Sequence, residues 1–291
     1  MSSILSQFTP ISAETAAQIQ ANLIAYFQLF AGLPGITFVD EDITWIASGA
    51  EAPGNHVLRT QIADDRVEQC IDETLRQIGQ RANQVDWYVF PSCQPPDLGE
   101  RLAARGAAGG PDGVWMLVGK IGGPGGNWLL ADLNNLPSPP VVSEEFHVKM
   151  VTNQTMLHDW VRLSLTGFGH SLPLPQWPEE NAFYAAYTRH GFGPDAYSLH
   201  YIGYRGDCPV TTGTLLLAGG IAGLFDISTP AAFRRQGFGS AISWAMVQEA
   251  KKRGYQQAYV WSSNMGKGVY QGVGFAPIEL GMREYQWQKR L

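Results

Sequence analysis

The stretch Phe225-Asp226-Ile227-Ser228-Thr229-Pro230-Ala231-Ala232-Phe233-Arg234-Arg235-Gln236-Gly237-Phe238-Gly239-Ser240 joins an apolar segment to the start of an expected helix. Gly237 and Gly239 remove side chains at positions where a ligand could approach the backbone. The amide groups of a first helical turn point at such a ligand, and the helix dipole favours negative charge there. Arg234 and Arg235 can add charge-assisted hydrogen bonds. This order of residues predicts an anion-binding loop over Arg234–Ser240, called the anion cradle below, and a pyrophosphate is the expected ligand.

Two well-known phosphate-binding patterns do not fit this part of the chain. A Rossmann fingerprint needs a third glycine, but position 242 is Ile242. A P-loop needs Gly-Lys followed by Ser or Thr, whereas Gly266-Lys267 is followed by Gly268. Because the chain contains 33 glycines, a Gly-x-Gly pattern is weak by itself, and its surroundings have to decide.

The neighbouring segments supply that context. Leu215 to Thr229 is an apolar, strand-like run that glycines interrupt at an expected hairpin turn. Ser240 to Arg253 has apolar residues on one helical stripe, and Gln257 to Ser262 has the composition of a second strand. The glycine loop is therefore expected between a strand and a helix, with a further strand after the helix.

Over residues 145–291 the sequence resembles the GCN5-related N-acetyltransferase (GNAT) superfamily. The acetyl-CoA motif of that family, Arg/Gln-x-x-Gly-x-Gly/Ala, is matched by Arg234, Gly237 and Gly239. A second family signature, Tyr-x-x-x-Gly-Phe after the next strand, is matched by Tyr270–Phe275. The two motifs occur in the family's order, which makes the resemblance specific.

The resemblance implies an α/β domain, with a mixed central sheet whose strands splay apart and helices that flank it. It also implies acetyl-CoA as cosubstrate. Main-chain groups of Ile227 and Thr229 would contact the pantetheine arm, and Asn264 would lie close to it. The residues that would hold the pyrophosphate are Arg234, Arg235, Gln236, Gly237, Phe238, Gly239 and Ser240.

The same resemblance places Tyr270 near the CoA sulfur as general acid. A free thiol has a pKa near 8.5 and a tyrosine near 10, so proton donation to a departing thiolate costs about 2 kcal/mol before the environment is counted. Asp226 interrupts an apolar strand, and a carboxylate there needs a partner. It could bind the substrate amine, act as the general base, or be a structural carboxylate at the sheet edge.

The predicted function is transfer of an acetyl group from acetyl-CoA to a primary amine of a small molecule or peptide, by direct attack. The alternative is a catalytically silent acyl-CoA-binding regulatory protein. Tyr270 favours the enzyme, because a pure binder has no need of a proton donor. Aromatic residues between the expected domain boundary and the core strands of the second half are expected to form either ordinary core or an aromatic-walled acceptor pocket. These residues are Trp160, Phe168, Trp177, Phe183, Tyr184, Tyr187 and Phe192.

The first half of the chain contains a weak internal repeat of the second. Val85–Ser92 parallels Gln256–Ser263 at an offset of 171 residues. At this offset the two glycines of the anion loop fall on Arg66 and Glu68, which puts a carboxylate where a phosphate should lie. The copy is therefore expected to have lost its cofactor site. An α/β domain of unrelated origin is the alternative.

The expected domain boundary lies in the proline-rich segment Leu133–Pro140. We accordingly expect a degenerate GNAT-like domain over residues 1–140 and an acetyl-CoA-binding GNAT domain over residues 141–291.

Composition narrows the partners and the compartment. The formal net charge is −6 and no basic cluster exceeds Lys251–Arg253, which argues against nucleic acid as a partner. The longest apolar run, Leu215–Phe225, is too short to span a membrane. Three scattered cysteines do not make a disulfide framework, and the N-terminus lacks a basic signal-peptide region, so a cytoplasmic setting is expected. The six histidines have no metal-ligand spacing, so no metal is expected.

Overall fold

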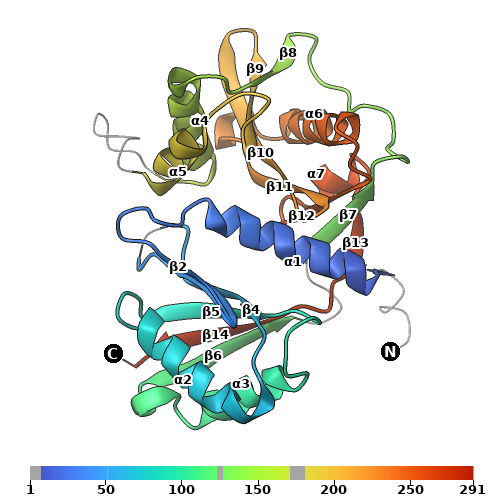
Figure 1. Cartoon of the computed structure of the whole chain (residues 1–291). Coiled ribbons are helices and arrows are strands. Elements are labelled where there is room, and N and C mark those ends of the chain that lie inside the picture. Colours follow the sequence, from blue (N-terminus) through green and yellow to red (C-terminus); the bar gives the residue numbers. More distant parts are fainter. Residues whose placement is uncertain (1–7, 51, 123–126, 171–180, 291) are drawn as a thin grey trace. The chain divides into compact units, whose positions relative to one another are not determined.

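The computed structural model describes residues 8–50, 52–122, 127–170 and 181–290. The chain divides into two compact units (Figure 1). Unit C comprises Met1–Thr9 and Asn127–Ile278, and unit N comprises Pro10–Gly126 and Glu279–Leu291. Each unit is built on one mixed sheet with helices on its faces, as the sequence predicts.

Among the described residues, the sheet of unit C has eight strands in the order β1-β13-β7-β12-β11-β10-β9-β8. The strands are β1 (Thr9–Pro10), β7 (Trp128–Asp132), β8 (Phe146–Met150), β9 (Ser198–Arg205), β10 (Cys208–Ala218), β11 (Ile221–Ser228), β12 (Gln257–Trp261) and β13 (Ala276–Glu279). Helices α4 (Gln154–Gly167) and α5 (Ala182–His190) cover one face of this sheet, and α6 (Phe238–Lys252) and α7 (Lys267–Gln271) cover the other (Figure 1).

The core of unit C fixes both helix layers to the central strands. Ile242 and Met246 of α6 pack in one buried cluster with Leu215 of β10. On the opposite face, the indole Nε1 of Trp160 in α4 donates to the main-chain oxygen of Gly213 at 3.3 Å. A Cβ atom at Gly213 would lie 2.7 Å from Met246 Cε, so the glycine leaves room for the end of the Met246 side chain on the sheet.

The sheet of unit N has the order β2-β3-β4-β5-β14-β6. Its elements are α1 (Ala13–Gln28), β2 (Thr37–Asp40), β3 (Ile43–Ala47), β4 (His56–Thr60), α2 (Val67–Ile78), β5 (Gln84–Val89), α3 (Leu98–Ala107), β6 (Trp115–Gly122) and β14 (Arg283–Lys289), with a 3₁₀ turn at Asp64–Arg66 before α2. Helix α1 packs on one face, where the ring of Phe27 lies 4.9 Å from that of His56. On the other face, the absence of a side chain at Gly99 of α3 leaves room for the hydroxyl of Tyr285.

The two units repeat the same order of elements. In each, an antiparallel ladder leads into a parallel strand-helix-strand crossover, which is β4-α2-β5 in unit N and β11-α6-β12 in unit C. A further helix and two strands follow the crossover in chain order. The crossover helices begin at Val67 and Phe238, which are 171 residues apart (238 minus 67). The predicted internal repeat is therefore present in the topology.

The final strand of each half belongs to the sheet of the other half. Strand β7 precedes the proline-rich segment, yet it pairs with β12 and β13 in unit C. Strand β14 ends the chain and pairs with β5 and β6 in unit N. The compact units divide after residues 9, 126 and 278, which differs from the expected single division after residue 140. Prolines mark a loop, but they carry no information about which sheet the flanking strands join.

The strand exchange makes a prediction about fragments. A fragment of residues 141–291 lacks β7, so it leaves β12 and β13 with unpaired edges, which promote aggregation. A fragment of residues 127–278 retains β7 and omits β14. We expect the second fragment to give a clearly higher soluble yield and a cooperative thermal transition by circular dichroism, and the first to precipitate. A soluble, cooperatively folding fragment of residues 141–291 would contradict this account.

Candidate active site

The parallel ladder between the two central strands of unit C is short. It runs from the pair Ala222–Ala258 to the pair Leu224–Val260. Strand β11 continues for four residues beyond Leu224, to Ser228. Past the ladder, β12 remains paired with β7 as far as Trp261. The central strands therefore stop hydrogen-bonding to each other halfway along β11, where the resemblance led us to expect an opening for a ligand.

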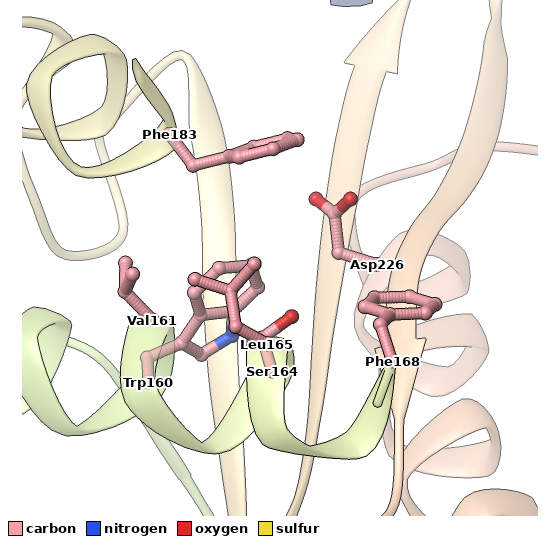
Figure 2. A pocket seen from close by; sticks show the side chains of 7 residues that line it. All are labelled: Trp160, Val161, Ser164, Leu165, Phe168, Phe183 and Asp226. Atoms are coloured by element: carbon pink, nitrogen blue, oxygen red, sulfur yellow. The ribbon is translucent and has the colours of Figure 1, made fainter. Parts of the chain in front are cut away.

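Strand β11 also leaves the regular register with its other neighbour at this point. The register with β10 shifts between the pairs Thr214–Phe225 and Thr212–Ser228. Within this bulge, Asp226 has a φ of 51°, a conformation that is costly for a residue with a side chain. Bulges re-aim side chains, and the carboxylate of Asp226 points into a hollow between β11 and α4 (Figure 2).

The loop after β11 has the backbone geometry of an anion cradle. Arg235 and Gly237 have φ values of 61° and 83°, and left-handed residues in such a turn direct N–H groups toward a common point. Helix α6 begins at Phe238, and no side chain among the described residues caps its N-terminus. The first amide inside the helix that finds an intrahelical partner is that of Ala241, which donates to the oxygen of Gly237 at 3.0 Å. The amides before it are available for an anion.

Two of the three predicted side-chain ligands in this loop are engaged by the protein itself. The Arg234 guanidinium donates to the oxygens of Thr229 at 2.9 Å and Gly167 at 2.8 Å, which ties the loop to the end of α4. Gln236 accepts from Arg205 at 3.2 Å. Arg235 is exposed beside them. Arg205 was not identified from the sequence because it ends a strand 31 residues earlier and matches no motif.

The predicted ligands at the start of α6 use their side chains for packing. Phe238 is buried, and its ring stacks on Phe146 at 5.2 Å. A Cβ atom at Gly239 would lie 3.4 Å from Val269 of α7, and the Ser240 hydroxyl donates to the oxygen of Val269 at 3.4 Å. Gly239 and Ser240 therefore pack α6 against α7, and Phe238 packs on Phe146. Only the main-chain amides of these three residues remain for binding a ligand.

The residues expected near the pantetheine arm lie beside the opening. Ile227 lies on β11 beyond Leu224. It is half-buried and packs against the core of unit C. The oxygen of Thr229 accepts one hydrogen bond from Arg234, so its main chain is already tied to the loop. Asn264 accepts from the amide of Asn127 at 2.8 Å. Asn127 directly precedes β7, so this contact depends on the strand exchange, which the sequence does not reveal.

Tyr270 is buried on α7, directly after β12. Its ring lies in a T-shaped contact with Phe275, with ring centroids 6.0 Å apart. Burial raises the pKa of Tyr270 above its ordinary value. The hydroxyl therefore keeps its proton throughout the physiological pH range and can act as a hydrogen-bond donor. Val269, the residue before Tyr270, accepts a hydrogen bond from Ser240, so α7 contacts the first turn of α6 next to Tyr270 in the chain.

A polar chain leads from Asp226 into the core. The hydroxyl of Tyr187 on α5 donates to Asp226 Oδ2 at 2.7 Å. The Tyr187 ring lies 3.9 Å from the ring of His200, which is buried and hydrogen-bonded through Nδ1 to Thr214 at 2.9 Å. Burial lowers the pKa of His200 to about 3, so this imidazole is uncharged at neutral pH. The hydrogen bond from Tyr187 thus ties one carboxylate oxygen of Asp226 to the core.

The hollow at Asp226 is lined mainly by apolar side chains. Figure 2 shows its walls, which come from α4, α5 and β11 and consist of Trp160, Val161, Ser164, Leu165, Phe168, Phe183 and Asp226. Three members of the predicted aromatic group therefore line this pocket. Tyr184 and Tyr187 are buried beside it, Phe192 does not line it, and Trp177 lies outside the described residues.

In unit N the equivalent helix terminus holds carboxylates of the chain itself. Arg66 takes the place of the first glycine as N-cap of α2, and Glu68 lies in the first turn. Arg101 of α3 forms ion pairs with Glu68 and Asp97, each at 3.0 Å, and with Asp64. These carboxylates occupy the positive end of the helix dipole. A phosphate would meet like charges there.

The slot between the central strands of unit N is closed as well. Beyond the ladder of β4 and β5, Gln61 and Gln94 form a further parallel bridge. The amide of Gln94 donates to Thr60 at 2.9 Å, and the amide of Ile62 donates to Gln94 at 3.3 Å. The chain's own backbone thus fills the position that stays open between β11 and β12.

The described residues offer neither a metal site nor a membrane-spanning helix. There, no group of three or more His, Cys, Asp or Glu side chains is placed to hold a metal ion. In the same part of the chain, no helix has both the length and the apolar character needed to cross a membrane.

Comparison with solved structures identifies the fold. A GCN5-related N-acetyltransferase from Kribbella flavida superposes with a TM-score of 0.59 at 14% identity, over 93% of this chain and 96% of that chain. A tandem GNAT protein from the clavulanic acid biosynthesis pathway gives a TM-score of 0.58 at 13% identity, over 96% and 97%. A putative GNAT-family acetyltransferase from Novosphingobium aromaticivorans gives 0.53 at 11% identity, over 96% and 100%.

No protein-family model matches the sequence, and neither does any curated protein. The structural likeness nevertheless extends over nearly the whole chain, in both units, so it confirms the predicted fold class. The chain has the fold of the tandem GCN5-related N-acetyltransferases.

Proposed function

We propose that the chain transfers an acetyl group from acetyl-CoA to a primary amine at the site in unit C. The observations that support this proposal are three features of neighbouring elements in unit C. These are the end of the ladder at Leu224, the uncapped first turn of α6, and Tyr270 on α7, the helix that α6 contacts. The names of the similar structures support the reaction class.

The residues of the opening fit acetyl-CoA. The amides of Phe238, Gly239 and Ser240 would bind the pyrophosphate, with Arg235 exposed beside them. The main chain of β11 beyond Leu224 would bind the pantetheine arm as an added strand does. When bound, acetyl-CoA supplies the acyl group as a thioester.

The chain's own groups would then act on the attacking amine and on the departing sulfur. The carboxylate of Asp226 would accept a proton from the amine nitrogen, directly or through water, while the Tyr187 hydroxyl keeps the carboxylate oriented. The Tyr270 hydroxyl would donate a hydrogen bond to the departing sulfur. Because burial raises the pKa of Tyr270, complete proton transfer costs more than the unperturbed values imply. Hydrogen bonding to the developing negative charge is therefore the better description of its role.

A catalytically silent acyl-CoA-binding protein would need the anion site at the start of α6. It would need neither the buried Tyr270 nor the Asp226 carboxylate in the pocket between α4, α5 and β11. The presence of both groups favours the enzyme. Measuring turnover separately from affinity distinguishes the two functions.

The cofactor site predicts one acetyl-CoA per chain. Isothermal titration should give one site for wild type, and Gly237→Glu should weaken binding by about 10-fold or more, because a carboxylate replaces the phosphate at the helix N-terminus. Gly254→Glu is the matched control, since Gly254 also has a positive φ, of 90°, and open space around it, but ends α6. Both substitutions should cost about 1–3 kcal/mol of stability through backbone strain.

The titration can contradict the proposal in two ways. Two equivalent sites would show that the carboxylates at α2 do not exclude the cofactor. Equal affinity of the Gly237→Glu and Gly254→Glu variants would move the pyrophosphate away from α6.

The hydrogen bond from Tyr270 to the departing sulfur predicts that Tyr270→Phe lowers turnover by on the order of 100-fold and leaves acetyl-CoA affinity nearly unchanged. Tyr255→Phe is the control, because Tyr255 is a half-buried tyrosine that packs on the same core. Since the pKa of Tyr270 is raised above 10.0, the neutral donor persists as the pH rises from 7 to 10, so Tyr270 should produce no alkaline loss of turnover in that range. Turnover of Tyr270→Phe within about threefold of wild type would assign the acid to water or another residue.

A further inference from the structure

We propose that the acceptor is a primary amine carried on an apolar, preferably aromatic, body, which binds in the pocket between α4, α5 and β11 with its ammonium group on Asp226. This inference deepens the proposed acetyl transfer and rests on it. It is argued from the walls of the pocket, from its charge, and from its position on β11.

The walls of the pocket suit an apolar ligand. Phe183 reaches in from α5 and Phe168 from the end of α4, and the two rings border the same hollow (Figure 2). Phe168 is 57% exposed, so a large apolar side chain is left in water at the rim. The floor is rigid, because Trp160 is fully buried in a T-shaped contact with Tyr187 at 5.5 Å. Covering such a rim with an apolar ligand is favourable, and the fixed floor reduces the entropy lost on binding.

The polar groups of the pocket select for a cation. Among the seven side chains that line it, Asp226 is the ionisable one and Ser164 is the other polar one. The Tyr187 hydroxyl donates to Asp226 Oδ2, and the uncharged His200 lies against the Tyr187 ring. A carboxylate in mainly apolar surroundings gains from a ligand ammonium. Amines that carry a second carboxylate nearby would be repelled, and amino sugars would find too few partners for their hydroxyls.

The position of Asp226 connects this pocket to the transfer reaction. Asp226 immediately precedes Ile227 on β11, and that strand's main chain beyond Leu224 is the proposed track for the pantetheine arm. The bulge turns the Asp226 side chain toward α4 and α5. An amine held by this carboxylate therefore lies at the strand along which the thioester would arrive.

The test measures binding of three probes to the full-length protein by ligand-observed NMR and titration, with and without coenzyme A. The probes are 2-phenylethylamine, its uncharged analogue 2-phenylethanol, and ethanolamine, a polar amine without the ring. We expect 2-phenylethylamine to bind about 10-fold or more tightly than either comparison probe.

Three variants separate the charge from the walls. Asp226→Asn should abolish the advantage of the amine over the alcohol while leaving the alcohol's affinity unchanged. Phe168→Ala, at a mostly exposed position that does not endanger folding, should weaken both aromatic probes several-fold. Asp207→Asn makes the same charge change in the exposed β9–β10 turn and should alter nothing.

The inference is overturned if ethanolamine binds as tightly as 2-phenylethylamine, if no probe binds under either condition, or if Asp226→Asn keeps the preference for the amine. Release of the thiol from acetyl-CoA, measured in parallel with the two amine probes, separates the two proposals. Aspartate-dependent binding of 2-phenylethylamine without thiol release upholds the acceptor pocket and defeats acetyl transfer. Thiol release with polar amines alone upholds acetyl transfer and defeats the pocket assignment.

Discussion

The short parallel ladder between β11 and β12 is the constraint on which the site depends. Three residue pairs hold the two central strands together, and the last is Leu224–Val260. Beyond it, β11 is released from one neighbour and bulges against the other, which turns Asp226 toward α4 and α5. Because β11 separates from β12 here, the loop that follows β11 can place the first turn of α6 against α7. A longer ladder would close the opening and straighten the strand.

Unit N shows what happens when the same topology is closed. Its crossover strands are joined again by the bridge between Gln61 and Gln94, and its helix terminus is filled by Glu68 with Arg101 as counterion. The protein therefore keeps two copies of one scaffold, of which one retains an opening. Unit N is needed even without a ligand site, because each sheet contains a strand from the other half of the chain: β7 in unit C and β14 in unit N.

The sequence predicted what local signals encode. The helix expected over Ser240–Arg253 spans Phe238–Lys252, and the strand expected over Gln257–Ser262 ends at Trp261, because glycine and apolar periodicity act over a few residues. The strand exchange could not be predicted, since pairing of distant strands has no local signal. The hydrogen bonds of Asp226 with Tyr187 and of Gln236 with Arg205 join residues 39 and 31 positions apart. Many other tyrosines and arginines in the sequence were equally plausible partners.

Hydrogen–deuterium exchange with and without coenzyme A tests the central claim most directly, because it locates the ligand on the backbone. The account predicts that the ligand protects amides at residues 227–229 and 238–240 and leaves residues 60–68 of unit N unchanged. Protection in unit N, or none at the start of α6, would contradict the claim that the open crossover of unit C is the place where the cofactor binds.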